Sequence, residues 1–150
     1  MRIAVVDGQG GGIGKAIVDR IKKANIDNVE ILALGTNSFA TDQMLKAGAH
    51  MGATGENAII YNMDKVDIVC GVIAILSANS MLGELTPSMA TAISSSSAFK
   101  VLLPINRCGI HVVGVVDSNL NTYIDEVVVT IERYISEKGE SNKWVALKTF

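Results

Sequence analysis

Short apolar runs alternate with amphipathic stretches along the chain. A continuous apolar run is typical of a β-strand that is buried on both faces of a parallel sheet. The apolar runs predict five strands: Ile3–Val6, Val29–Leu34, Val66–Leu76, Lys100–Leu103 and Ile110–Val116. The segment Gly52–Gly55, between the second and third of these strands, has the composition of a flexible stretch.

The segments between the strands carry apolar residues at helical spacing. Thr36, Asn37 and Ser38 are possible N-caps of one helix, and Thr86 followed by Pro87 is a strong start for another. The predicted helices are Gly12–Ala24, a helix from the Thr36–Ser38 caps to Ala47, Glu56–Met63, a helix from Pro87 that ends in Ser94–Ser97, and Leu120–Glu137. Gly139–Asn142 is expected to break the last of these.

Alternating strands and helices predict an α/β fold with right-handed crossovers. We expect a three-layer, Rossmann-like, doubly wound parallel sheet of about five strands in the order 2-1-3-4-5, with 3-2-1-4-5 as the alternative. Residues 1–138 are expected to form this single domain. The tail 139–150 is expected to dock on the domain or at a subunit interface, because Trp144, Val145, Leu147 and Phe150 are apolar. A homo-oligomer is therefore expected.

The composition narrows the class of protein. The chain has 150 residues, enough for one domain that needs no disulfide or metal to fold. Its net charge of −2 argues against nucleic-acid binding, which usually requires a basic surface. The longest uncharged run, Ile68–Gly83, is 16 residues long, whereas a membrane helix needs about 20 apolar residues. We therefore expect a cytoplasmic protein that binds neither nucleic acid nor membrane.

A glycine-rich loop lies between the first strand and the first helix, with five glycines between Gly8 and Gly14. Unpaired N–H groups at a helix N-terminus attract phosphate, and glycine lets a ligand approach the backbone closely. A tight turn alone would not need five glycines, because each costs conformational entropy. We therefore expect a small phosphate-bearing ligand. The residues expected to bind it are Asp7, Gly8, Gln9, Gly10, Gly11, Gly12, Ile13, Gly14, Thr36, Asn37, Asn79 and Arg107.

The spacing of Gly8, Gly12 and Gly14 in this loop resembles the glycine motif of the short-chain dehydrogenase/reductase family. The resemblance covers about the first third of the chain and implies an NAD(P) cofactor. That family typically has Thr where this chain has Asp7, and its catalytic Tyr-x-x-x-Lys lies on a later helix. Two such strings occur elsewhere in this chain and are taken as structural: Tyr61–Lys65 and Tyr134–Lys138.

Over nearly its full length, the chain resembles an uncharacterised bacterial family, a domain of unknown function found mainly in anaerobic firmicutes. This resemblance implies a Rossmann-like fold and supplies no activity. The matching segments are Asp7–Gly14, Ala33–Asn37, Ala53–Ala58, Ser80–Pro87 and Leu103–Cys108.

The residues leave the identity of the ligand open. An NAD site usually has an acid after the second strand that binds the ribose, whereas this chain has Gly35, Thr36 and Asn37 there. Thr36 or Asn37 could bond a ribose, or the ligand could be a mononucleotide or another phosphate ester. Asp7 would repel a phosphate unless a metal or a proton intervened. The expected cofactor is NAD(P) or another phosphate-bearing nucleotide.

Polar loops after parallel strands meet at one sheet edge, where ligands bind. Arg107 is the best cationic partner there, because a guanidinium holds phosphate or carboxylate through two hydrogen bonds. Glu56 and Glu84 are candidates for acid–base catalysis, and Cys108 is a candidate nucleophile. Two alternatives to nucleotide binding follow: an enzyme that acts on a small anionic metabolite through Glu56, Glu84 and Arg107, and a non-catalytic regulatory or scaffold subunit. The sequence shows no metal-ligand spacing.

Overall fold

The computed structural model describes the backbone of residues 1–105 and 108–148, and the side chains of those up to residue 139. Strands and helices alternate along the chain. They are β1 (Arg2–Asp7), α1 (Gly12–Ala24), β2 (Glu30–Gly35), α2 (Ser38–Lys46), β3 (Met51–Thr54), α3 (Glu56–Asn62), β4 (Ile68–Val72), α4 (Pro87–Ser95), β5 (Phe99–Leu103) and α5 (Leu120–Lys148). Two short 3-10 helices, η1 (Ile73–Leu76) and η2 (Met81–Gly83), lie between β4 and α4.

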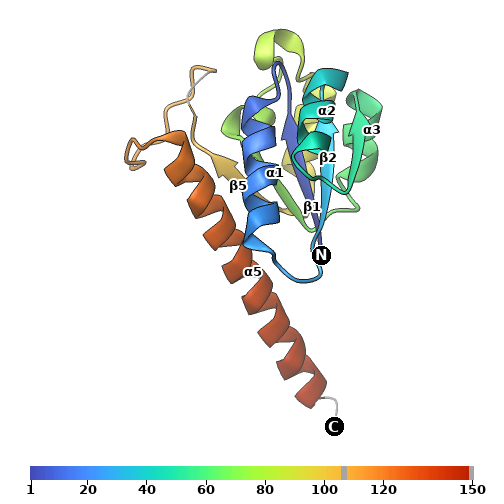
Figure 1. The fold of residues 1–150 in the computed structure, drawn as a ribbon, viewed down its shortest axis with the longest axis vertical. Helices are drawn as coiled ribbons and strands as arrows, with labels where there is room; N and C mark the ends of the chain where they lie inside the picture. The colour runs from blue at the N-terminus through green and yellow to red at the C-terminus, as the bar shows by residue number, and fades with distance from the viewer. Residues whose placement is uncertain (106–107, 149–150) are drawn as a thin grey trace.

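The five strands form one parallel sheet in the order β3-β2-β1-β4-β5. The central strand β1 pairs with β2 and β4, so that Val5 lies opposite Ala33 on one side and Cys70 on the other. Helix α1 packs between α2 and α5, whereas α3 packs against α4 (Figure 1). These helices form the outer two of three layers, and the predicted three-layer, Rossmann-like α/β fold is confirmed.

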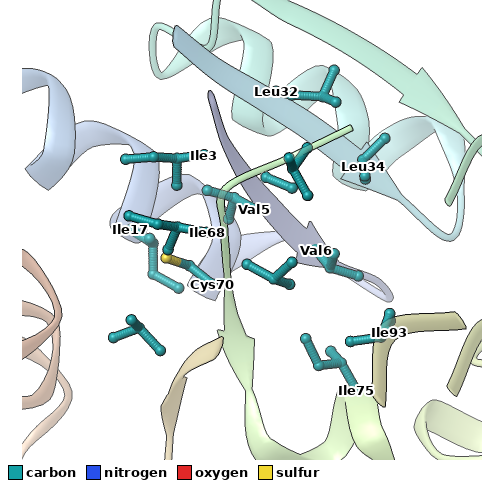
Figure 2. Packing of buried hydrophobic residues seen from close by; sticks show 14 of the residues in the cluster. Ile3, Val5, Val6, Ile17, Leu32, Leu34, Ile68, Cys70, Ile75 and Ile93 are labelled. Carbon is teal, nitrogen blue, oxygen red and sulfur yellow. The ribbon is translucent and has the colours of Figure 1, made fainter. Parts of the chain in front are cut away.

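The core lies between the central strands and the helix faces that pack on them. Ile3, Ala4, Val5 and Val6 of β1 are at most 1% exposed, because both faces of this strand are covered. Figure 2 shows core side chains from both sides of the sheet, with Ile17 of α1 on one side of β4 and Ile93 of α4 on the other. Burial of each such side chain contributes about 1.5–3 kcal/mol.

The strand order corrects the expectation of 2-1-3-4-5. Four predicted strands correspond to β1, β2, β4 and β5, and these lie next to one another in the expected sequence. The fifth strand of the sheet is β3, which lies at the opposite edge from the expected place and pairs with β2, with Ala53 opposite Leu34. Numbered along the chain, the order is therefore the alternative, 3-2-1-4-5. The segment Gly52–Gly55 has the composition of a flexible stretch, yet most of it lies in β3. An exposed edge strand needs no apolar run, so the composition does not reveal it.

The predicted strand Ile110–Val116 is wrong. The backbone there is irregular, and the side chains of Val113 and Val116 are 89% and 83% exposed. Gly114, in the middle of the run, has a φ of 86°. A left-handed residue at this point turns the chain and prevents an extended strand. Apolar composition alone therefore gave a false strand.

Two other predicted boundaries differ from the structure. The strand expected over Val66–Leu76 contains only Ile68–Val72, and the chain continues as η1. Helix α5 continues through Gly139 and ends at Lys148 rather than near Glu137. A single glycine inside a helix costs only about 1 kcal/mol relative to alanine, which is not enough to end it. Among the described residues, no helix is long and apolar enough to span a membrane.

Candidate functional site

A cavity of about 640 Å³ opens at the carboxyl ends of β1 and β4. The chain winds outward from β1 in one direction through β2 and β3, and in the other through β4 and β5. The gap between β1 and β4 is therefore the topological switch point, where open α/β sheets bind ligands. The described residues that line the cavity are Asp7, Gly8, Gln9, Gly10, Gly11, Gly12, Ile13, Val72, Ala74, Met81, Leu82, Ile105, Cys108 and Leu120.

Three glycines of the loop are required by the fold. Gly11 has a φ of 68°, and a Cβ atom there would lie 2.7 Å from the Cα atom of Ala40. A Cβ atom on Gly14 would lie 2.7 Å from the Cβ atom of Asp7, and one on Gly8 would lie 2.4 Å from the Thr36 hydroxyl. These three positions therefore accept only glycine without a shift of their neighbours.

Gly10 and Gly12 have no such requirement. A Cβ atom at either position would meet nothing within 4 Å, and neither residue has a positive φ. Both line the cavity. Within the described part of the chain, the backbone N–H groups of Gly10, Gly12 and Ile13 have no hydrogen-bond partner. The loop therefore leaves bare backbone donors at the cavity wall, beside the positive end of the α1 dipole.

Asp7, the last residue of β1, fixes the glycine loop through two hydrogen bonds. Its carboxylate accepts hydrogen bonds from the N–H groups of Gly8 at 2.8 Å and Gly14 at 2.6 Å, so it takes the place of a capping side chain for α1. The carboxylate is 6% exposed. Burial raises the pKa of Asp7 above its ordinary value, against the lowering effect of the two N–H groups, and the nearby Glu84 charge also raises it.

Glu84 joins the glycine loop to the segment after β2. Its Oε2 atom accepts hydrogen bonds from the Gln9 N–H at 2.7 Å, the Thr36 hydroxyl at 2.7 Å and the Asn37 amide at 3.1 Å. The Asn37 amide also donates to the Gln9 carbonyl at 3.0 Å. The Gln9 N–H lowers the pKa of Glu84 below its ordinary value, and the Thr36 and Asn37 bonds lower it further, against partial burial.

Of the other predicted site residues, some line this cavity and others do not. Cys108 lines it and is half-buried. Glu56 begins α3 instead, where its carboxylate accepts a hydrogen bond from Thr86, the N-cap of α4. Asn79 is exposed and is not among the lining residues, and its N–H donates to the Leu85 carbonyl at 2.8 Å. Arg107 lies outside the described residues.

Sequence reasoning missed the apolar wall of the cavity. Met81, Leu82, Ile105 and Leu120 come from three separate segments that only the fold brings together. Met81 and Leu82 have left-handed backbones, with φ values of 56° and 57°. Such a conformation costs about 1–3 kcal/mol per non-glycine residue and often marks a functional site. Because left-handed backbone at apolar residues leaves no pattern in a sequence, no sequence signal could have located this wall.

Two further features bear on the chemistry. Among the described residues, no group of three or more His, Cys, Asp or Glu side chains could hold a metal ion.

The Lys65 ammonium lies 2.7 Å from the centre of the Tyr61 ring, and the Lys138 ammonium lies 5.6 Å from that of Tyr134. Both Tyr-x-x-x-Lys strings thus form cation–π pairs on a helix or just beyond its end.

None of the curated proteins matches the chain. Among solved structures, the chain is similar to a dodecameric FMN-dependent Ubix-like decarboxylase from Escherichia coli O157:H7, with 12% sequence identity and a TM-score of 0.43. That similarity covers 91% of this chain and 95% of the decarboxylase chain, and it bears on no function here. A family model described as a domain of unknown function, DUF3842, matches residues 2–136. The chain therefore belongs to this family, which confirms the resemblance to an uncharacterised family.

Proposed function

We propose that this protein binds a small phosphate-bearing nucleotide in the cavity at the β1–β4 switch point. The observation that carries the proposal is the pair Gly10 and Gly12. Both line the cavity, and neither is required to be glycine by packing or by its φ angle. Glycine inside a helix or loop costs conformational entropy, so these two positions need another reason. Close approach of a ligand to the backbone is such a reason.

The phosphate of the ligand would lie against the first turn of α1. The N–H groups of Gly10, Gly12 and Ile13 point to no acceptor among the described residues, and a phosphate oxygen is the acceptor that such a helix start favours. Asp7 is less repulsive than its charge suggests, because its oxygens already accept two N–H groups and its raised pKa favours neutralisation.

The ring of the ligand would lie against the apolar wall. Nucleotide sites combine a few polar groups with a mostly apolar lining, and Met81, Leu82, Ile105 and Leu120 supply that lining here. NAD(P)-like dinucleotides and mononucleotides both belong to the proposed class. The alternative of an enzyme for a small anionic metabolite has less support, because Glu56 bonds Thr86 and Glu84 bonds the loop rather than lining the cavity.

Gly12→Ala tests the proposal. The added methyl group enters open space, so the ligand-free protein should melt at the same temperature or slightly higher. The same methyl group should keep a phosphate away from the N–H groups. We therefore expect at least about a tenfold loss of affinity for whichever of AMP, FMN, NAD or NADP binds the wild type, measured by calorimetry.

Two control variants accompany this test. Gly139→Ala also adds a methyl group to open space, remote from the cavity, and should leave affinity unchanged. Gly14→Ala meets Asp7 and should instead lower the stability of the fold, by about 1–3 kcal/mol. The proposal would be wrong if none of the four nucleotides bound at millimolar concentration, or if Gly12→Ala bound as tightly as the wild type.

A further inference from the structure

We propose that the cavity selects a mononucleotide and rejects dinucleotides, because Glu84 fills the place where one of the two nucleotides of a dinucleotide would lie. This inference rests on the proposed function and names its ligand class more narrowly. It follows from where the cavity extends, from what occupies the space beside it, and from which wall is left free for a ring.

Among the described residues, the lining of the cavity lies on the β4 side of β1. Its described lining comes from the end of β1, the loop after it and the start of α1, from the end of β4 and η1, from η2, from the segment after β5 and from the start of α5. None of the described lining residues belongs to β2, to α2 or to the segment between them. In dinucleotide-binding Rossmann domains the first nucleotide extends to the end of the second strand, where an acid binds its ribose. The described lining does not reach that half of the site.

The missing half is filled by side chains of the protein itself. Glu84, from the distant segment after η2, reaches the end of β2 and bonds Thr36, Asn37 and the Gln9 N–H through one oxygen. The space beside Gly8 shows how tightly this region is packed. A Cβ atom there would lie 2.4 Å from the Thr36 hydroxyl and 2.8 Å from both the Glu84 carboxylate and the Met81 sulfur. A ribose at the end of β2 would have to displace Glu84 from Thr36 and Asn37.

Glu84 also explains why the chain has no acidic residue directly after β2. The carboxylate at that position is supplied by Glu84, which lies 75 residues beyond Gln9 in the chain. It is already hydrogen-bonded by protein groups. The acid therefore closes the β2 side of the loop, instead of binding a ribose.

The opposite wall has a free apolar surface of the right kind for a ring. Leu82 lines the cavity, yet it is 98% exposed. Its φ of 57° is unfavourable for leucine. Because Leu82 is exposed, its side chain does not stabilise the fold by burial. A ring placed between Leu82 and Leu120 would bury it. A single ring against this wall and a single phosphate at the glycine loop make up one mononucleotide.

Calorimetry on the full chain tests the selectivity, with each dinucleotide compared with its own halves. NAD is compared with AMP and nicotinamide mononucleotide, and FAD with AMP and FMN. We expect each dinucleotide to bind at least about tenfold more weakly than its better half. A smaller difference, or a dinucleotide that binds more tightly, would overturn this inference and leave the proposed function standing. If none of these compounds binds, both fail.

Glu84→Ala removes the group that closes the β2 side, and Glu84→Gln keeps its bulk and one oxygen acceptor. The measurement is the ratio of dinucleotide to mononucleotide dissociation constants, since a general loosening of the loop weakens both ligands. We expect this ratio to fall about tenfold in Glu84→Ala and to stay unchanged in Glu84→Gln. Equal ratios in the wild type and in Glu84→Ala would overturn the role assigned to Glu84.

Leu82→Ala tests the ring-binding wall separately. The residue is exposed, so its truncation should leave the melting temperature unchanged. Affinity for the best mononucleotide should fall about fivefold or more, and affinity for inorganic phosphate should stay the same. Val129→Ala, an exposed valine on α5 away from the lining, is the matched control. Unchanged mononucleotide affinity in Leu82→Ala would contradict the placement of the ring.

Discussion

The two carboxylates beside the glycine loop are held in opposite ways. Asp7 is 6% exposed, and burial makes its charged form costly. Glu84 is only partly buried, and three hydrogen bonds to its Oε2 atom favour its charged form. The pKa of Asp7 is therefore raised and that of Glu84 is lowered. A group whose pKa differs between the folded and unfolded states makes the stability of the fold depend on pH.

The opposite directions predict opposite pH dependences. A lowered carboxyl pKa stabilises the fold above the unfolded-state pKa, and that contribution is lost as pH falls through the folded-state value. The stability difference between wild type and Glu84→Gln should therefore shrink from pH 7 toward pH 3. The raised pKa of Asp7 has the opposite effect, because the folded state takes up a proton at a higher pH than the unfolded state. The stability of the wild type relative to Asp7→Asn should therefore increase as pH falls. Urea unfolding at each pH measures both, and slopes of the same sign would contradict the assignment.

At the scale of elements, apolar runs predicted strands correctly only where the backbone is extended without a left-handed residue. The runs that became β1, β2 and β4 have no left-handed residue within them, and each lies between other strands. The equally apolar segment Ile110–Val116 contains Gly114 in a left-handed conformation and follows the edge strand β5 without pairing to it. A strand needs both an extended backbone and a partner.

This difference predicts how the two segments respond to polar substitutions. Replacing both Val113 and Val116 by serine should change the free energy of unfolding by less than about 0.5 kcal/mol, because both side chains are exposed. Val101→Ser, in β5, should cost about 2 kcal/mol or more, because Val101 is 7% exposed. Equilibrium denaturation compares them. A loss in the loop variant as large as that of Val101→Ser would show that the segment pairs as a strand.

At the scale of the whole molecule, the sheet order places the cavity. Because the crossover after β3 returns to the other side of β1, the segments that follow β1 and β4 lead to opposite sides of the sheet, and the cavity lies between them. The apolar core ends near Ile135 among the residues whose side chains are described. Figure 1 shows α5 running past the end of the sheet beyond that point. We expect residues 139–150 to bind another copy of the chain.

A chain shortened to residues 1–138 tests this expectation. It keeps the core and the cavity lining, so its melting temperature at high dilution should match that of the full chain within a few degrees. Light scattering should show a homo-oligomer for the full chain and a monomer for the shortened one. A monomeric full chain, or a shortened chain that keeps the oligomer, would contradict it.

The sequence alone determined the class of fold and the place of the loop. Both depend on local patterns: apolar runs, helical spacing and glycines between the first strand and helix. Short-range sterics and burial leave these patterns in the chain itself. The position of β3 was not predictable, because Met51–Thr54 has no apolar run and is a strand only through its pairing with β2.

Only the tertiary structure decided which glycines of the loop the fold requires and which it does not. That distinction depends on contacts with distant residues, such as Ala40 beside Gly11 and Thr36 beside Gly8. The same is true of Glu84, whose bond to Gln9 joins positions 75 residues apart. Hydrogen bonds and close contacts of this range leave no pattern in neighbouring residues. The sequence therefore located the glycine loop, and the fold determined the shape of the cavity beside it and the ligand proposed for it.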